Sequence, residues 1–404
     1  MFRTTRMSFL LDIFRRAHRE RRHTAMAIHT EVVLCQPSSI SFTDSGIPSV
    51  SDNQSSEGLQ KASKLLHDLQ CVAFPTETVY GLGALALDET AASRIFSTKG
   101  RPPDNPLIVH VSSPEMLTRL LPKDYTPSPL YRLLMRRFWP GALTLLFPTD
   151  GETIPSIITA GQPTVAIRMP SHPVARALIA VADSPIAAPS ANSSGKPSPT
   201  RAEHVFRDLE GKIALVLDGG ACNVGLESTV VDGLHADGNL RVLRPGGITV
   251  EELEAAICDE MNKTMEEAPT TPGMKYRHYS PAVPVTLIHT LSPPPNNIQR
   301  SPVATFIGGL KQRHPTGMGS LKVGLLMPSD SALLDMLSQM DGIVWVRYPL
   351  GPLGEPSISA QRLFDGLLTL EKEDVDLILI EEMKEEREGL AVMNRVKKAA
   401  GEFI

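Results

Sequence analysis

The chain has 404 residues, 42% of them apolar, and a formal net charge of -5 at pH 7. This length predicts two or three domains, and the slightly acidic balance argues against a surface built mainly to coat nucleic acid. The four cysteines, at positions 35, 71, 222 and 258, are too widely spaced to suggest a zinc site or a disulfide framework. No apolar run reaches the roughly 18 residues that span a bilayer, so we expect no membrane contact.

Residues 1–57 are predicted to form a basic, disordered extension. The first 23 residues carry seven arginines against one aspartate and one glutamate, and the apolar residues between Phe9 and Phe14 can share one helical face. That combination is typical of a mitochondrial presequence. A solvated basic tail, or a start at Met26 that removes the segment, explains the same residues. Residues 36–57 are rich in Ser and Pro and predict a disordered linker.

Residues 58–262 alternate between strand and helix patterns, which predicts an α/β domain with a large sheet. Short apolar segments with Gly or Pro stops predict strands at 71–76, 105–111, 142–148, 164–170, 185–191, 214–220, 228–232 and 240–246. Helical spacing predicts helices at 57–70, 88–101, 171–183 and 201–209.

Residues 263–284 are polar and rich in proline, which predicts a linker, although its "KYRHYS" cluster is unusual for a passive spacer. Residues 285–404 again alternate and predict a small, mostly parallel α/β sheet. Its expected strands are 302–309, 321–328, 343–349 and 375–382, and its expected helices are 330–340 and 357–373.

Polar residues at strand and helix ends are the candidates for chemistry, because the sequence has no Walker-type phosphate loop and no Cys/His ligand cluster. Lys99 and Arg101 end a predicted helix, where they either complement its dipole or, fixed by the prolines that follow, bind phosphate. The loop "APSANSSGKPSPT" at 188–200 either is an ordinary turn or lets its hydroxyls and amide approach a ligand closely. Arg168 stands alone in an apolar strand and needs an anionic partner such as a carboxylate.

The motifs "FPTETVYGLG", "KGRPPDNPLIVH", "FWPGALTLLF", "VAIRMP", "APSAN", "ESTVVD" and "RPG" follow one another as in the YrdC/Sua5 family, which this chain resembles. "TPGMKYRHYSP", "RLFDGL" and "GLAVMNRVKKAA" resemble the longer, Sua5 branch of that family. The resemblance spans about 60–404. It implies an α/β fold with a YrdC-like twisted large sheet flanked by helices, followed by a C-terminal Rossmann-like α/β domain.

The resemblance implies a nucleotidyltransferase, an L-threonylcarbamoyladenylate synthase. Such enzymes condense L-threonine, bicarbonate or CO2, and ATP to threonylcarbamoyl-AMP and diphosphate. A separate transferase complex then uses the product to form N6-threonylcarbamoyladenosine at position 37 of tRNAs reading codons that begin with A. We expect Mg2+ to arrive with ATP, and a cytoplasmic location, with mitochondria as a second site if the N-terminus is a presequence.

Two other functions are alternatives for this sequence. One is a double-stranded RNA or tRNA binding module, which the net charge opposes only weakly. The other is a carbamoyl-transferring maturation factor, which would need zinc-finger and acylphosphatase segments, and this sequence has no Cys-rich stretch.

The resemblance also implies the site residues. L-threonine would contact Thr78, His110, Arg168, Ala188 and Ser228, with Thr76 as a less certain neighbour and Tyr80 as a wall of the pocket. ATP would contact Lys99, Arg101, Asn105, Thr164, Ser190, Asn192, Ser198, Arg244 and Tyr279, of which Lys99 and Arg101 would also stabilise charge during catalysis. The linker, with Arg277 and Tyr279, would form a lid over the nucleotide.

Overall fold

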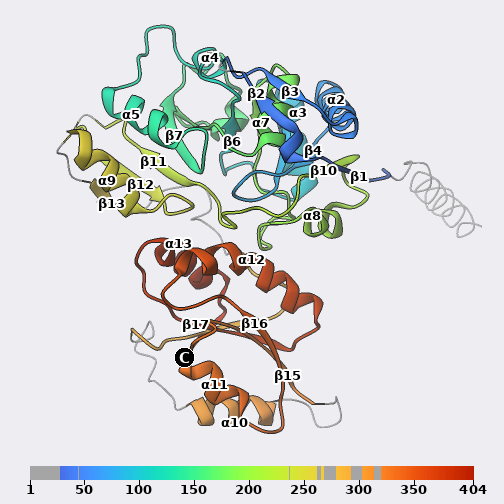
Figure 1. Cartoon of the computed structure of the whole chain (residues 1–404), viewed down its shortest axis with the longest axis vertical. Coiled ribbons are helices and arrows are strands. Elements are labelled where there is room, and N and C mark those ends of the chain that lie inside the picture. Colours follow the sequence, from blue (N-terminus) through green and yellow to red (C-terminus); the bar gives the residue numbers. More distant parts are fainter. Residues whose placement is uncertain are drawn as a thin grey trace, which may run out of the picture.

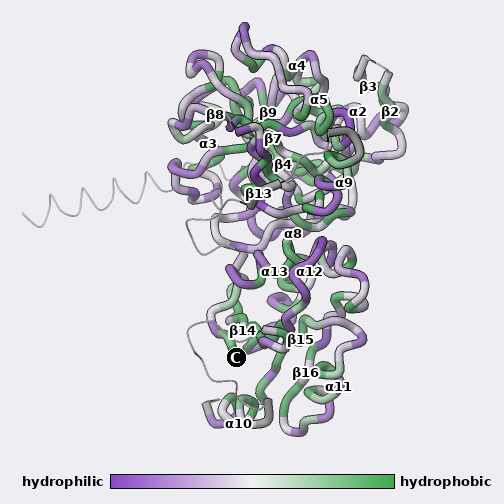
Figure 2. The backbone as a smooth tube through the Cα atoms, turned by 90° about the vertical axis from the view of Figure 1, so that its left-hand side faces the viewer, coloured by the Kyte–Doolittle hydropathy of each residue, from purple (hydrophilic) through white to green (hydrophobic). Residues whose placement is uncertain are grey.

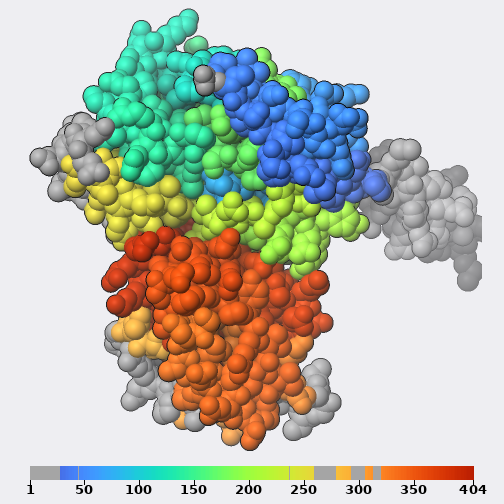
Figure 3. All heavy atoms as spheres, viewed as in Figure 1, coloured from blue at the N-terminus to red at the C-terminus, as the bar shows by residue number. Residues whose placement is uncertain are grey.

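The structure, a computed structural model, describes residues 28–404 except 44, 236, 262–264, 268–278, 293–302 and 314–319. The described chain forms two bodies, one built from the strands β1 to β13 and the other from β14 to β18 (Figure 1). Two helices of the second body, α12 (Pro356–Lys372) and α13 (Glu388–Ala399), lie on the side that faces the first. The space-filling view shows the two bodies in contact (Figure 3).

The first body is built on an eleven-stranded mixed sheet. In spatial order its strands are β1 (Glu31–Leu34), β10 (Leu215–Asp218), β4 (Val72–Phe74), β5 (Gly81–Leu85), β9 (Ile186–Ala187), β6 (Ile108–His110), β8 (Thr164–Arg168), β7 (Leu143–Pro148), β11 (Thr229–Asp232), β12 (Leu240–Arg244) and β13 (Met265–Glu267). Parallel and antiparallel neighbours are interspersed. Every strand predicted in this half is present, and the prediction missed β5, whose "GLG" is typical of a turn.

Helices cover this sheet and close its core. They are α2 (Asn53–His67), α3 (Glu89–Lys99), α4 (Pro114–Thr118), α5 (Pro129–Phe138), α6 (Ser156–Thr159), α7 (Pro173–Val181), α8 (Ala202–Leu209) and α9 (Val250–Met261). α3 corresponds to the helix predicted at 88–101. Asp88 accepts a backbone hydrogen bond at its start, and Gly100, with a φ of 62°, ends it after Lys99. Apolar side chains of strands and helices together form one continuous buried cluster.

The prediction that residues 36–57 are a disordered linker is wrong. Residues 37–39 form the short helix η1 (Pro37–Ser39), and β2 (Ile40–Phe42) pairs with β3 (Pro48–Val50). β1, just before them, extends the large sheet as its edge strand beside β10. A few apolar side chains are enough here because they join an existing core: Cys35 and Ile40 are buried, and the Arg176 guanidinium lies over the Phe42 ring. The predicted basic tail at 1–27 lies outside the described residues.

The second body is a five-stranded, all-parallel sheet, as the alternating pattern predicted. In spatial order its strands are β16 (Val344–Pro349), β15 (Lys322–Met327), β17 (Leu377–Glu381), β14 (Val285–Ile288) and β18 (Glu402–Phe403). The remaining helices are α10 (Val303–Arg313) and α11 (Ala332–Ser338). Most residues of β14 and β15 are hydrophobic (Figure 2).

The strand predicted at 302–309 is wrong, because this segment belongs to helix α10. Phe306 and Ile307 are buried, and Leu310 packs against the same cluster. That spacing follows one face of a helix rather than the alternation of a strand. A run of short apolar residues does not by itself separate the two.

The predicted linker at 263–284 is only partly a linker. Its residues Met265–Glu267 form β13, which pairs in parallel with β12 at the edge of the large sheet. Residues 268–278, including Arg277, lie outside the described residues, so the predicted lid does too. Tyr279 is described and buried. Within the described chain, the helices are all too short or too polar to cross a bilayer.

Candidate active site

A pocket of about 790 Å³, open mouth included, lies beside the ends of several strands of the large sheet. Of the fourteen predicted site residues, twelve line it: Thr78, Lys99, Arg101, His110, Arg168, Ala188, Ser190, Asn192, Ser198, Ser228, Arg244 and Tyr279.

Asn105 and Thr164 are not in the lining. Asn105 contacts a residue that does line the pocket: the Asn105 backbone carbonyl accepts a hydrogen bond from Arg101 Nη2 at 3.2 Å. Thr164 begins β8, four residues before Arg168, and so lies toward the other end of the strand. Tyr80, predicted to wall the pocket, is a core residue instead; its hydroxyl donates to the Gly220 carbonyl at 2.7 Å.

Strand register brings three of the polar side chains into one row. His110 on β6 is paired with Arg168 on β8, and Arg168 is paired with Thr144 on β7. Directly paired residues project from the same face of a sheet. The row therefore places an imidazole and a guanidinium side by side in the pocket lining, with the Thr144 hydroxyl next to Arg168 but outside the lining.

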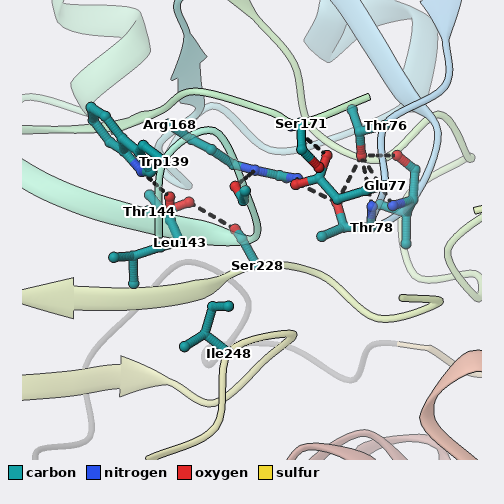
Figure 4. A network of polar contacts seen from close by, with 12 residues as sticks. Thr76, Glu77, Thr78, Trp139, Leu143, Thr144, Arg168, Ser171, Ser228 and Ile248 are labelled. Carbon is teal, nitrogen blue, oxygen red and sulfur yellow. Dashed lines mark hydrogen bonds and ion pairs between the residues drawn. The ribbon is translucent and has the colours of Figure 1, made fainter. Parts of the chain in front are cut away.

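Arg168 has the carboxylate partner that the sequence required, and that partner is Glu77 (Figure 4). Its Nη1 also donates to Thr78 Oγ1 at 2.9 Å, and its Nε donates to the Gly141 carbonyl at 3.1 Å. Burial alone would raise the pKa of Glu77, but the Arg168 guanidinium outweighs it and holds that pKa below its ordinary value. The pair fixes the guanidinium in the pocket wall.

Thr78 is oriented by a second threonine. Thr76 Oγ1 lies 2.8 Å from Thr78 Oγ1 and donates to the Val79 carbonyl at 2.7 Å, so the turn after β4 is closed by its own side chains. Thr76 itself is absent from the lining. It supports the site through Thr78.

His110 is neutral and has an unused ring nitrogen. Burial and the nearby Arg168 charge lower the pKa of His110 to about 3. Its Nδ1 is buried and has no hydrogen-bond partner among the residues that the structure describes. An unpaired buried polar atom is costly, so this nitrogen points to a ligand.

Ser228 is held from two sides. Its Oγ lies 2.7 Å from Thr144 Oγ1, and Arg244 Nη2 donates to the Ser228 carbonyl at 2.8 Å (Figure 4 shows the Thr144 contact). The turn after β12 can lie close to Ser228 because Gly246 lacks a side chain: a Cβ at Gly246 would overlap the backbone of Glu227 and Ser228. The "RPGG" motif thus packs the Arg244 guanidinium against the start of β11.

Lys99 reaches away from the end of its helix. Its side chain is buried, and Nζ donates to the backbone carbonyls of Ser190 and Asn192. Burial, reinforced by Arg101, lowers the pKa of Lys99. The side chain therefore does more than complement the dipole of α3: it supports the 190–192 loop in the lining, and a bound anion would restore its preference for the charged form.

Arg101 is fixed by the proline-rich turn, as its position in the motif suggested. Its Nη2 donates to the carbonyls of Asn105 and Pro106 at 3.2 and 3.1 Å. Its Nε is buried, and no described residue forms a hydrogen bond with it. This second unpaired buried atom in the lining again indicates a polar ligand.

The described lining is strongly cationic. It contains Lys99, Arg101, Arg168, Lys196 and Arg244 against a single carboxylate, Glu227. Hydroxyls and backbone amides of the 188–198 loop complete the wall. A concave, basic, hydroxyl-rich site is suited to a ligand that carries phosphate or carboxylate groups.

Sequence reasoning missed Glu77, Glu227, Thr144 and Arg395. Glu77 stands between the two threonines of the "FPTETVYGLG" motif. The buried Arg168 indicated that a carboxylate partner was needed, but it did not identify Glu77 as that partner. Arg395 belongs to α13 in the second body and contacts Glu227 across the chain. Nothing in the sequence near Arg395 indicated that contact.

Two family models match nearly all of the described chain. One, Sua5_yciO_yrdC, which is described as telomere recombination, matches residues 64–246. The other, described as the C-terminal domain of threonylcarbamoyl-AMP synthase, matches residues 248–401. The first match lies within the first body, and the second covers the second body together with α9 and β13 of the first.

Individual relatives cover most of the chain. The threonylcarbamoyl-AMP synthase of Schizosaccharomyces pombe is 41% identical over 87% of this chain and 90% of its own length. The corresponding Bacillus subtilis protein is 43% identical over 85% and 93%. The structure of P. abyssi Sua5 complexed with L-threonine is similar at a TM-score of 0.71 and 37% identity, over 93% of this chain and 99% of that one. The chain belongs to the Sua5-type threonylcarbamoyl-AMP synthases, the nucleotidyltransferases of tRNA threonylcarbamoyladenosine formation that join a YrdC domain to a C-terminal Sua5 domain.

Proposed function

We propose that this pocket binds L-threonine against the row formed by His110 and Arg168, and ATP against Lys99 and Arg101. The observation that supports this division most directly is the grouping of side chains. Small hydroxyls and a neutral imidazole gather at the strand ends around Arg168, whereas Lys99 is attached to the 190–192 loop.

Threonine recognition would use groups that match its three polar parts. The contacts of Arg168 with Glu77, Thr78 and Gly141 use three of its five N–H donors, which leaves two for the substrate carboxylate. His110 Nδ1, lacking a partner, would accept a hydrogen bond from the substrate amine or hydroxyl. Because His110 is neutral, it does not repel a protonated amine. Thr78, Ser228 and the backbone at Ala188 would complete the wall.

ATP recognition would use the cations and the small residues of the opposite wall. Lys99, Arg101 and Arg244 would neutralise the phosphates, and Ser190, Asn192 and Ser198 would donate to phosphate or ribose oxygens. Tyr279 would lie against the nucleotide. Asn105 would act by fixing Arg101, and the predicted contact of Thr164 with ATP has no support from the lining.

The chemistry needs no protein nucleophile. The neutral amine of threonine adds to CO2 and loses a proton, which gives a carbamate. A carbamate oxygen then attacks the α-phosphorus of ATP, the bond to the β-phosphate oxygen breaks, and diphosphate leaves with the bonding pair. The residues of this chain would hold two anions in line and stabilise charge on the phosphate oxygens.

For Mg2+ we propose only that it arrives on the nucleotide. Mg2+ prefers carboxylate, phosphate and water oxygens. The single carboxylate in the described lining, Glu227, is occupied by Ser198 and Arg395. A metal held by protein ligands does not fit this donor set, and we derive no step through one.

The acyl adenylate would pass to a separate transferase complex that modifies the tRNA. We further propose a cytoplasmic location, with the basic residues 1–26 as a candidate mitochondrial signal. Direct tRNA binding remains a secondary proposal, to be tested by the salt dependence of RNA affinity.

Omission of single substrates tests the proposed function. Diphosphate release should require L-threonine, bicarbonate and ATP together, and a threonine- and AMP-containing product should accumulate in step with it. Lys99→Met should slow both by about 10²–10³-fold, whereas Lys61→Met, which removes a surface ion pair with Glu31, should change neither. Diphosphate release that is the same without threonine would contradict the proposal.

A further inference from the structure

Arg395 connects the second body of the structure, the C-terminal domain, to the pocket in the first body, the catalytic domain. It lies on α13, is fully buried, and is the largest such side chain described. Its Nε and Nη2 donate to Glu227 Oε2 at 3.1 and 3.0 Å. Its Nη1 donates to the Ala391 carbonyl of its own helix at 3.2 Å and to the Pro245 carbonyl of the catalytic domain.

Glu227 links Arg395 to the lining of the pocket. Its second oxygen, Oε1, accepts a hydrogen bond from Ser198 Oγ at 2.6 Å, and both residues line the pocket. Burial alone would raise the pKa of Glu227, but Arg395 and then Arg244 outweigh it and lower that pKa. Glu227 is therefore a charged carboxylate in the wall of a cationic site.

A carboxylate in that position opposes the binding of a polyanion unless it is neutralised. A buried ion that loses its partner is uncompensated, and its repulsion of other anions is little screened. Arg395 supplies the compensating charge from another domain. Arg244 contributes less, because its guanidinium donates hydrogen bonds to the carbonyl and hydroxyl of Ser228 rather than to Glu227.

We propose that Arg395 is a positioning residue that makes the pocket compatible with ATP: it neutralises Glu227 and holds it toward Ser198 only while the C-terminal domain is docked. The inference rests on the proposed function, in that it takes the ligand to be a nucleoside triphosphate. By reciprocity, ATP binding should stabilise domain docking to the same extent that docking favours ATP binding.

Further contacts between the two domains hold Arg395 beside Glu227. The Tyr279 ring packs on Phe364 of α12, with centroids 5.4 Å apart. Arg201 Nε donates to Asp365 Oδ1 at 2.8 Å across the same boundary. Gly225, just before Glu227, approaches Gln361 so closely that a Cβ would overlap its backbone. The boundary thus fits closely beside Glu227, as a positional role requires.

The test is a ligand series of increasing charge, measured by calorimetry on the full chain with adenosine, AMP and ATP. We expect Arg395→Gln to weaken ATP binding by about tenfold or more, AMP binding less, and adenosine binding not at all. Glu227→Gln in the same chain should restore ATP binding, because it removes the repelling charge. Arg362→Gln removes an exposed arginine of α12 and serves as the matched control.

Equal weakening of all three ligands, or failure of the double variant to recover, would show that Arg395 has only a structural role. Unchanged ATP affinity in Arg395→Gln would overturn the proposal. If that variant does not fold, Glu227→Gln alone decides: ATP should bind at least as tightly as to the unaltered chain, and weaker binding would contradict the inference. If the unaltered chain fails to bind ATP, the proposed function fails instead.

Discussion

Replacement of Arg168 by methionine should separate substrate binding from fold stability. Methionine keeps most of the apolar stem and removes the guanidinium. The side chains of Arg168 and Glu77 are 4% and 10% exposed, so the variant leaves a carboxylate buried without its partner. Breaking a buried pair in this way costs about 3–5 kcal/mol. At about 2–4 °C per kcal/mol for a domain of this size, the melting temperature should fall by about 6–20 °C.

Loss of the guanidinium should also weaken threonine binding independently of this stability loss. A charge-assisted hydrogen bond contributes about 1.5–3 kcal/mol, which corresponds to about a 10- to 150-fold increase in the dissociation constant for threonine. ATP binding should change far less. Threonine and ATP affinities are measured by calorimetry, well below the melting temperature of the variant.

The double variant Glu77→Gln/Arg168→Met distinguishes the two effects. It removes the unpaired carboxylate, so most of the thermal stability should return while threonine binding stays weak. Threonine affinity that is unchanged in either folded variant would refute the placement of the substrate carboxylate at Arg168. Recovery of threonine binding in the double variant would show that Glu77, rather than the missing guanidinium, was responsible.

Four further outcomes are expected. Lys99→Met should lower the turnover number by about 10²–10³ in a diphosphate-release assay; if the lysine only capped α3, the change would be a stability loss of about 0.3–1 kcal/mol with normal turnover. Because the pKa of His110 is about 3 in the folded chain, the unfolded chain binds the extra proton between pH 3 and about 6.5. Urea unfolding should therefore show stability falling as pH drops through that window, by up to about 1.4 kcal/mol per pH unit, and His110→Gln should reduce this slope. Gly225→Val should expose the domain boundary to limited proteolysis, since its side chain would overlap Gln361; an unchanged digestion pattern would argue against the close approach. A chain starting at Met26 should keep its melting temperature and activity, because β1 begins at Glu31, while residues 1–26 fused to a reporter test the presequence.

Most helices and strands that depend on neighbouring residues were predicted from the sequence, whereas those that depend on contacts with distant segments were not. Helix α3 and the strand containing Arg168 were predictable because Asp88, Gly100 and a short apolar run act over a few residues. β1 was not, since its stability comes from pairing with β10, nearly two hundred residues later. The helix at 303–313 was mistaken for a strand because its short apolar run fits both periods until its partners are known.

The candidate site shows the same division. Residue types and their order pointed to twelve lining residues, largely through the family resemblance. The buried Arg168 also required a carboxylate on physical grounds. Which carboxylate it meets, and that Arg395 reaches Glu227 from another domain, depend on the three-dimensional arrangement of distant segments. No local pattern encodes a pairing across 168 residues.

The central claim is that threonine and ATP share one pocket, each at its own wall. It is tested most directly by a crystal structure of the full chain with L-threonine and an ATP analogue that cannot be cleaved at the α-phosphate. We expect the threonine carboxylate at Arg168, its amine or hydroxyl at His110 Nδ1, and phosphate oxygens at Lys99 and Arg101. Threonine bound away from the Arg168 row, or nucleotide bound at the C-terminal sheet instead, would contradict it.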